Sequence, residues 1–321
     1  MKFVRRRRTQ TRSRSRCPDR RESLRGWRPT EVVCTLRRKE IPRKYLRVKS
    51  QRGSTCATTS VLSLVEYVVR RGASTPLDPC FSELYTHYAF VTRPREPATV
   101  SRSKKVFDQG VGRIFDLFDT LHRFGFLDEE SFVAKMDDVT EERFLEAEAQ
   151  VRALGNAVLT VGCVHPQVRV GGGENRAQFL ETIKILIAHE VPVYVCVCVR
   201  RASQTRIDVP ASKYDLQMKP YPGTRIDSHL LCLVGFDDAR GEFTYLNSWD
   251  RDWGASGYGR LPYRCILNLP DVGRSGAKCG YFVVGVRYQG VEYSIRDRVP
   301  LLDQITLHDY PFSPAVCPWG H

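Results

Sequence analysis

The stretch QRGSTCATTSVLSLVEYVV, residues 51–69, joins a short loop to a helix. Apolar residues recur at spacings of three and four through Val61–Val68, which is the period of an amphipathic helix. Ser54 or Thr55 can cap that helix, so Cys56 falls in its first turn. The positive end of the helix dipole favours a thiolate there. The stretch therefore makes Cys56 a candidate nucleophile, with a buried helix cysteine as the alternative.

The pattern of the chain changes after Gly155. Helical periodicity dominates before this residue, and short β-branched runs dominate after it. Helices first and strands second are typical of an α+β protein with two lobes. The expected helices are 56–69, 81–91, 111–124, 140–154 and 176–188, and the expected strands are 157–164, 191–199, 230–236, 243–246, 258–261 and 281–288.

The histidine best placed to activate a thiol is His229. It lies just ahead of the apolar run Leu230–Phe236, at the start of an expected buried strand. The next run, Phe243–Leu246, leads into Asn247, and a hairpin of this length places both residues at the same edge of the sheet. An amide oxygen there can accept the N–H of His229 and fix its tautomer. These residues predict a Cys-His-Asn site, against the alternatives of a core histidine and a turn asparagine.

Three segments of the chain resemble the motifs of papain-like cysteine peptidases, the papain/cathepsin superfamily, and they occur in the family's order. The matching segments are residues 48–56 with Ser60 and Glu66 for the nucleophile, Ser228–His229 with Val234–Phe236 for the histidine, and Asn247–Trp249 with Trp253–Gly254 and Gly257–Gly259 for the asparagine. The resemblance covers about residues 46–290. It is closer to bacterial-type members, which lack the disulfide of the nucleophile loop.

The resemblance implies a two-lobed papain-like fold. A mostly helical left lobe, about residues 46–154, would carry the nucleophile. An antiparallel, β-barrel-like right lobe, about residues 155–290, would carry the histidine and the asparagine. Residues 291–321 would form a C-terminal extension that packs on the domain.

The resemblance also implies an activity. The protein would be a cysteine endopeptidase that hydrolyses peptide bonds of a protein or peptide substrate through an acyl-enzyme. By analogy, Gln51 and the backbone N–H of Cys56 would bind the oxyanion. Trp249 would shield the hydrogen bond between the histidine and the asparagine from water, and Gly110 would lie along the substrate backbone. The implied site uses no cofactor and no metal.

Several positions depart from the family's pattern. Gln51 lies five residues before Cys56, where the family has six. Ala57 replaces the usual aromatic residue, and Asp250 replaces the usual glycine. These departures leave open a second function, that of a catalytically inactive papain-like protein that acts as a polyanion-binding or structural component through a basic tail.

The net charge of +14 belongs to one end of the chain. Residues 1–50 hold 19 Lys/Arg and 4 Asp/Glu, whereas the remainder holds 31 basic and 32 acidic residues. We expect residues 1–45 to form a disordered, solvated tail, because its like charges repel and it has little apolar surface to bury. Three roles stay open for the tail: binding to nucleic acid or another polyanion, nuclear targeting through Arg5–Arg8, or a solvated arm with no specific partner.

The eleven cysteines include no CxxC pair, which excludes a zinc ribbon and a thioredoxin-type motif. Cys196 and Cys198 lie in the apolar run Val191–Val199 and are interpreted as buried strand cysteines. No apolar run approaches the roughly 20 residues that span a bilayer, and the start of the chain has no secretory h-region. We therefore expect an intracellular or virion-associated protein without a membrane partner.

Overall fold

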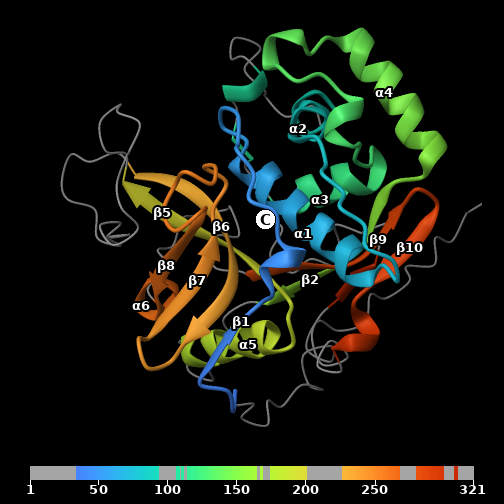
Figure 1. Cartoon of the computed structure of the whole chain (residues 1–321). Coiled ribbons are helices and arrows are strands. Elements are labelled where there is room, and N and C mark those ends of the chain that lie inside the picture. The colour runs from blue at the N-terminus through green and yellow to red at the C-terminus, as the bar shows by residue number, and fades with distance from the viewer. Residues whose placement is uncertain are drawn as a thin grey trace, which may run out of the picture. The chain divides into compact units, whose positions relative to one another are not determined.

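The computed structural model describes residues 34–93, 106–108, 110–111, 114–164, 167–168, 174–200, 226–267, 280–299 and 307–309. Residues 33–321 form one compact unit, whose elements are shown in Figure 1. Most of the expected basic tail lies outside the described residues. The part of the expected C-terminal extension beyond residue 309 lies outside them as well.

The order of the elements agrees with the predicted division into helices and then strands. The helices are α1 (Cys56–Gly72), α2 (Glu83–Thr92), α3 (Ile114–Arg123), α4 (Glu141–Leu154), α5 (Arg176–Ala188) and α6 (Tyr263–Leu267). The strands are β1 (Arg38–Glu40), β2 (Ala157–Val164), β3 (Gln167–Val168), β4 (Glu174–Asn175), β5 (Val193–Arg200), β6 (Ile226–Asp237), β7 (Glu242–Leu246), β8 (Tyr258–Pro262), β9 (Gly280–Tyr288), β10 (Val291–Ser294) and β11 (Leu307–Asp309). Because α1–α4 precede the first long strand, the predicted α+β class is confirmed.

Antiparallel pairing organises the main sheet in the part of the chain that the structure describes. Its strands follow the order β11-β2-β9-β5-β6-β7-β8, with β1 paired to β6 and β10 paired to β9. In the β6–β7 hairpin, Cys232 lies opposite Leu246 and Phe236 lies opposite Phe243. Strands β11 and β8 are the two ends of this path, so the described strands form an open sheet and do not close into a barrel.

Helix α1 packs between the sheet and the other helices of the first lobe (Figure 1). The predicted amphipathic helix is buried almost all round, because elements of both lobes cover it. Several of its polar side chains form hydrogen bonds within this environment. Thr59 Oγ1 donates to Glu83 Oε2 at 2.6 Å, and Ser60 Oγ donates to the Leu230 carbonyl on β6 at 3.2 Å. These bonds attach α1 to both lobes.

The sequence predicted a disordered tail that extends to residue 45, but the last part of this segment is folded. The predicted end of the tail is therefore wrong. Residues Arg38–Glu40 form β1 and pair with the end of β6. Arg38 lies 3.8 Å from the Asp237 carboxylate, and Ile41 is only 1% exposed. The local excess of positive charge concealed this packing, because the strand and the acidic partner that hold these residues lie far along the chain.

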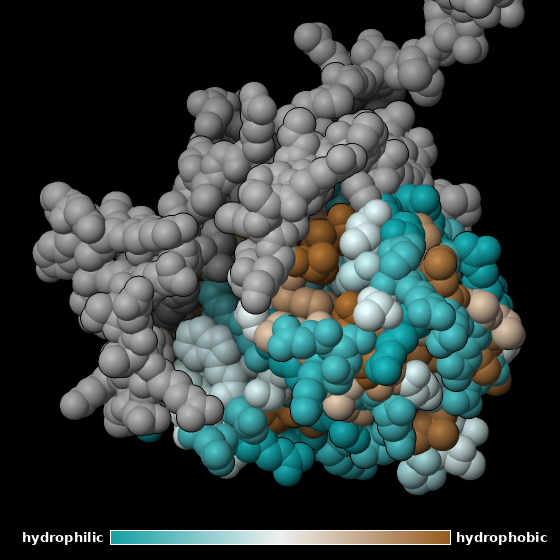
Figure 2. Space-filling view, turned by 90° about the horizontal axis from the view of Figure 1, so that it is seen from above, coloured by the Kyte–Doolittle hydropathy of each residue, from teal (hydrophilic) through white to brown (hydrophobic). Residues whose placement is uncertain are grey.

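The described residues on the face shown in Figure 2 form a mostly hydrophilic surface with scattered hydrophobic side chains. The large hydrophobic residues that are exposed lie on separate segments and are Leu36, Met136, Leu145 and Val291. Among the residues that the structure describes, no helix combines the length and the hydropathy needed to cross a bilayer.

A buried ion pair anchors the chain just ahead of the candidate nucleophile. Lys49 Nζ lies 2.6 Å from Glu66 Oε1 on α1, and both side chains are buried. The same carboxylate oxygen accepts the N–H of Phe81 at 2.8 Å, and Lys49 donates to the Phe81 carbonyl at 2.8 Å. The pair therefore joins residue 49, α1 and the segment that leads into α2.

Replacing Lys49 with Met is expected to lower the free energy of unfolding by about 3–5 kcal/mol, because it leaves the Glu66 carboxylate buried without its cation. Chemical denaturation of the two proteins measures the difference. The double variant Lys49→Met/Glu66→Leu should recover part of the loss.

The control is Arg287→Met, which removes one partner of an exposed ion pair with Glu292. It should cost about 1 kcal/mol or less, because exposed pairs are screened by water. A loss in Lys49→Met as small as that in Arg287→Met contradicts the anchoring role of the buried pair.

Candidate active site

Cys56 is the first residue of α1, as the sequence predicted, and it is half-buried. Thr55 occupies the N-cap position, but its side chain does not cap the helix. Instead, Thr55 Oγ1 accepts the N–H of Arg52 at 3.1 Å and donates to the Arg52 carbonyl at 2.9 Å. The expected side-chain cap by Thr55 is therefore wrong, because the hydroxyl closes the preceding turn. The Thr55 side chain therefore makes no bond to the first N–H groups of α1.

The loop before Cys56 is held against the segment Val106–Asp108. Ser54 N donates to the Phe107 carbonyl at 2.8 Å. Gly53 has a φ of +68°, and a Cβ at this position would lie 2.5 Å from the Phe107 carbonyl oxygen. Only glycine fits this turn, so the approach of the two segments sets the path of the chain into α1.

His229 and Asn247 lie together, as the hairpin length predicted. His229 Nε2 lies 2.8 Å from Asn247 Oδ1, and both side chains are buried. Ser248 N also donates to Asn247 Oδ1, at 2.9 Å. Because Asn247 Oδ1 is an acceptor only, His229 Nε2 carries the proton of this bond. The neutral imidazole therefore keeps Nδ1 as its proton acceptor.

Trp249 lies over the imidazole. Its ring stacks on His229 with a centroid distance of 4.6 Å and an interplanar angle of 29°. Trp253 meets Trp249 edge-on at 5.7 Å. The two indoles form an apolar cover next to the bond between His229 and Asn247. The shielding role that the resemblance implied for Trp249 stays a prediction.

The thiol of Cys56 contacts the strand that carries His229. The backbone of Leu230, the residue directly after His229, lies close enough to the Cys56 sulfur to lower the pKa of the thiol, against the larger effect of burial. One turn further along α1, Ser60 Oγ donates to the carbonyl of the same Leu230 at 3.2 Å. The helix start and the histidine segment are therefore adjacent, although 173 positions separate Cys56 from His229 in the sequence.

Gln51 bonds to the asparagine segment across the two lobes. Gln51 N donates to the Ser248 carbonyl at 2.7 Å, and Ser248 Oγ donates to Gln51 Oε1 at 2.6 Å. Gln51 Nε2 donates to the Gly53 carbonyl at 3.0 Å, which occupies one of its two N–H groups. Ser248, which orients this amide, was not among the predicted site residues. The sequence signal that could have identified Ser248 as a site residue was its position between Asn247 and Trp249 in the asparagine segment.

Comparison with known proteins adds evidence on the fold. No family model and no curated protein matches the chain. Among solved structures, it is similar to xylellain, a cysteine protease from Xylella fastidiosa, with a TM-score of 0.53 and 12% identity over 80% of this chain and 88% of that chain. The chain has the papain-like fold. The Carica candamarcensis cysteine protease CMS1MS2, solved in complex with E-64, also matches, with a TM-score of 0.47 and 19% identity over 77% of this chain and 98% of that chain.

Burial dominates the electrostatics of the site within this papain-like fold. It raises the pKa of the Cys56 thiol above its ordinary value, although the backbone of Leu230 acts in the opposite direction. Burial also lowers the pKa of His229 to about 4, against the hydrogen bond to Asn247. The helix dipole was expected to favour a thiolate. The surroundings instead favour a neutral thiol beside a neutral imidazole at rest.

Gly110 is the predicted site residue that the described contacts do not join to the others. It is exposed, and nothing lies within 4 Å of the position that a Cβ would take. Cys196 is half-buried rather than fully buried as predicted, and the side chain of Cys198 lies outside the described part. No group of His, Cys, Asp and Glu with metal-binding geometry occurs among the described residues.

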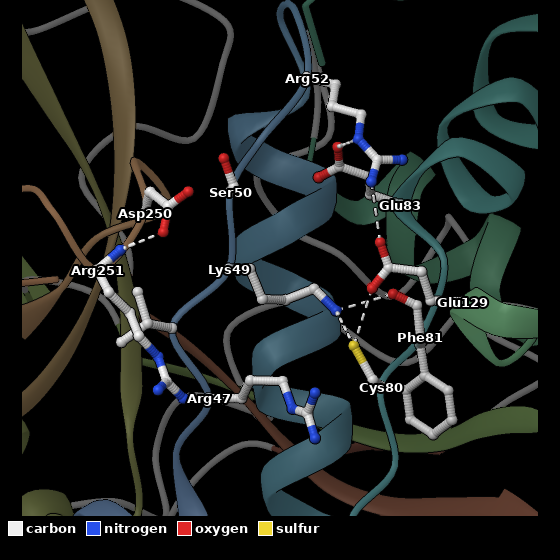
Figure 3. Close-up of a pocket in the computed structure, with 11 residues that line it drawn as sticks. Arg47, Lys49, Ser50, Arg52, Cys80, Phe81, Glu83, Glu129, Asp250 and Arg251 are labelled. Atoms are coloured by element: carbon white, nitrogen blue, oxygen red, sulfur yellow. Dashed lines mark hydrogen bonds and ion pairs between the residues drawn. The ribbon is translucent and has the colours of Figure 1, made fainter. Parts of the chain in front are cut away.

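A cavity of about 250 Å³ opens beside the contact between residues 49–51 and 248–250 (Figure 3). Two hydrogen bonds in its wall meet at Glu129: Arg52 donates to Glu129 at 3.1 Å, and Cys80 Sγ donates to Glu129 Oε2 at 3.0 Å. Its lining residues are Arg47, Val48, Lys49, Ser50, Arg52, Cys80, Phe81, Glu83, Glu129, Asp250 and Arg251. Cys56 and His229 are not among the residues that line it.

The lowered pKa of His229 predicts a loss of stability in acid. Below its unfolded pKa of about 6.5, the unfolded chain binds a proton that the folded protein excludes until the pH reaches about 4. Between pH 6.5 and 4 this difference should remove about 3 kcal/mol from the free energy of unfolding. Denaturation of the wild type and of His229→Gln across this range isolates the effect. An equal pH dependence in the two proteins contradicts the lowered pKa.

Proposed function

We propose that this protein is a cysteine-type peptidase, with Cys56 as the nucleophile, His229 as its base and Asn247 as the residue that orients the base. The observation that carries the proposal is the 2.8 Å contact between His229 and Asn247 under Trp249, on a strand whose next residue, Leu230, bonds Ser60 in the helix that Cys56 begins. A general base needs a partner that binds Nε2–H and leaves Nδ1 as the proton acceptor. A histidine buried only for packing does not need this arrangement. The arrangement supplies a nucleophile, a base and an orienting group in one place.

The proposed reaction uses the neutral pair as its starting state. As the Cys56 sulfur attacks the carbonyl carbon, His229 Nδ1 takes the thiol proton and then gives it to the leaving amine. The product is a thioester between the acyl group and Cys56. His229 next removes a proton from water, which attacks the thioester and releases the carboxylic acid and the thiol. Asn247 holds the imidazole in place through both steps, because it accepts only from Nε2–H.

Gln51 is the proposed oxyanion donor together with the backbone N–H of Cys56. Ser248 occupies Gln51 Oε1, so the amide group of Gln51 is turned with its N–H groups toward the loop that leads into α1. One of these N–H groups bonds Gly53, and the other is the proposed donor. The side chain of the N-cap residue Thr55 does not bond the first N–H groups of the helix, which supports the same role for the backbone N–H of Cys56. The substrate of such a site is a protein or peptide, and Gly110 stays a proposed contact for its backbone.

Labelling of thiols by iodoacetamide at pH 5–6 tests the proposal, because ordinary thiols are protonated there. The wild type should be alkylated selectively at Cys56, because its thiol can pass its proton to the adjacent His229 as it reacts. Cys56→Ala should lose the selective labelling and all peptide hydrolysis. Asn247→Ala should lower kcat by up to about 10⁴-fold, and Gln51→Ala should lower it by about 10²–10³-fold.

The matched control is Cys80→Ala, because Cys80 is half-buried like Cys56 and lines the cavity, whereas Cys56 does not. This variant should keep both the labelling at Cys56 and the hydrolysis. Labelling of the wild type that is spread evenly over several cysteines contradicts the peptidase proposal. It would favour the second candidate, an inactive papain-like protein, which the burial-raised pKa of Cys56 also favours.

The basic start of the chain is proposed to bind nucleic acid or another polyanion. Its support is compositional: Arg5–Arg8 and the further arginines of residues 1–33 face little acidic charge within that segment. Neutralising phosphates releases bound counterions, so the affinity should fall steeply with salt. Because the structure packs residues 34–45 on the sheet, the segment to change ends at residue 33.

Replacing Arg5–Arg8 with serines in the full chain is expected to weaken the retention of the protein on immobilised DNA or RNA and to flatten its salt dependence. Peptide hydrolysis and thermal unfolding should stay unchanged, because the described elements and the proposed catalytic residues all lie after residue 33 in the sequence. The readout is the salt concentration that elutes each protein. Elution of the variant and the wild type at the same concentration excludes binding through this cluster.

A further inference from the structure

Tyr194 on β5 carries a buried hydroxyl that has no hydrogen-bond partner in the structure. The residue is 1% exposed, so water does not satisfy the group. Burying a hydroxyl without a partner costs free energy, and folded proteins usually avoid it. Because the Tyr194 hydroxyl lies close to the candidate active site, a group of that site could become its hydrogen-bond partner.

The sheet register places Tyr194 near Leu230, the residue beside which the helix with the proposed nucleophile packs. On β5 and β6, Tyr194 lies opposite Cys232, and Cys196 lies opposite Leu230. Side chains two residues apart on a strand share one face, so these four residues line the same face of the sheet. A diagonal pair such as Tyr194 and Leu230 is separated by about 7–8 Å, within reach of an aromatic side chain.

Helix α1 rests on that same position. Ser60 Oγ donates to the Leu230 carbonyl at 3.2 Å, and the backbone of Leu230 lies close enough to the Cys56 sulfur to act on its pKa. Cys56 and Ser60 are four residues apart and therefore share one face of α1. Burial is the main cause that raises the pKa of the Tyr194 hydroxyl, and Cys56, Cys196 and Cys232 are the thiols near enough to raise it further.

We propose that the Tyr194 hydroxyl donates a hydrogen bond to the Cys56 sulfur when the thiol gives its proton to His229, which makes Tyr194 a positioning residue for the thiolate. The proposal rests on the peptidase function proposed above. A thiol is a weak acceptor, whereas a thiolate is a strong one, and hydrogen bonds to charged groups are about twice as strong as neutral ones. The unpartnered hydroxyl thus gains its partner only in the reactive state.

Tyr194 can act as this donor throughout the working pH range. Burial raises the pKa of its hydroxyl well above the ordinary value, so the group stays protonated. The other titratable groups around the position are Cys232 on β6 and Cys196 on β5, which share the face of Tyr194, and Tyr281 on β9, which packs against its ring. His229 on β6 lies on the opposite face of the strand in this register. His229 is the one group of this set that becomes a cation, and it takes the proton. The hydroxyl supplies a second, uncharged source of stabilisation.

The experiment compares Tyr194→Phe with the wild type by the rate of iodoacetamide alkylation at Cys56 between pH 4 and pH 10. The variant should react about tenfold more slowly at pH 6, and the pH at which the thiolate is half-formed should rise by about one unit, equivalent to about 1.4 kcal/mol. The kcat of peptide hydrolysis should fall by a similar factor. Thermal unfolding should be unchanged or shifted upward, because the lost hydroxyl had no partner.

The control is Tyr85→Phe. Tyr85 is also buried, but its hydroxyl donates to the Phe124 carbonyl at 2.7 Å in the helical lobe. This variant should keep the alkylation profile of the wild type, while its midpoint of thermal unfolding falls by about 2–4 °C. Tyr194→Phe should therefore lower the reactivity of Cys56 and keep the stability, whereas Tyr85→Phe should keep the reactivity and lower the stability.

The outcomes separate this inference from the proposed function. If wild-type Cys56 is alkylated selectively and Tyr194→Phe has the same pH profile, the role of Tyr194 is excluded and the peptidase proposal stands. If wild-type Cys56 reacts no faster than the other thiols, both are overturned. A Tyr194→Phe protein that fails to fold also overturns the inference, because an unpartnered hydroxyl adds nothing to stability.

Discussion

The backbone pairing of residues 49–51 with residues 248–250 is the contact on which the geometry of the site depends. Gln51 N donates to the Ser248 carbonyl, and Asp250 N donates to the Lys49 carbonyl at 3.1 Å. One of these segments leads into α1, and the other directly follows the asparagine. Main-chain atoms make both bonds, so they set the spacing of the two lobes independently of the side chains. A slip of one residue in this pairing would displace the helix start from the hairpin that carries the imidazole.

The parts of the site that lie within one short stretch could be predicted from the sequence. The spacing of apolar residues located the start of α1 at Cys56, and the length of the turn after Phe236 brought His229 and Asn247 together. Both depend on periodicity and loop length, which a single sequence contains. The order of the three motifs then indicated the two-lobed fold, since each motif occupies a fixed place in the papain-like architecture.

Features that depend on segments distant in sequence could not be predicted. Ile41 is buried because β1 pairs with β6, and no local pattern in an arginine-rich segment indicates that. Thr55 has the composition of a cap, yet its hydroxyl bonds Arg52 once the loop is closed. The acidity of Cys56 depends on how much of the sheet covers it, and burial outweighs the dipole effect that the sequence suggested. In the sequence, Tyr194 lies in a run of valines and is typical of a core residue. Only the structure shows that its hydroxyl is buried without a hydrogen-bond partner.

The strand β11 has a consequence for how this protein behaves in a crowded solution. It terminates the sheet beyond β2 and is only three residues long. The longer strands β5, β6 and β9 lie inside the path, each with a described neighbour on both sides, although β5 meets β9 only at Tyr194 and Val195. A terminal strand of this length offers a passing chain few N–H and C=O groups to pair with. At this end of the described path, the short strand therefore limits edge-to-edge pairing with another chain.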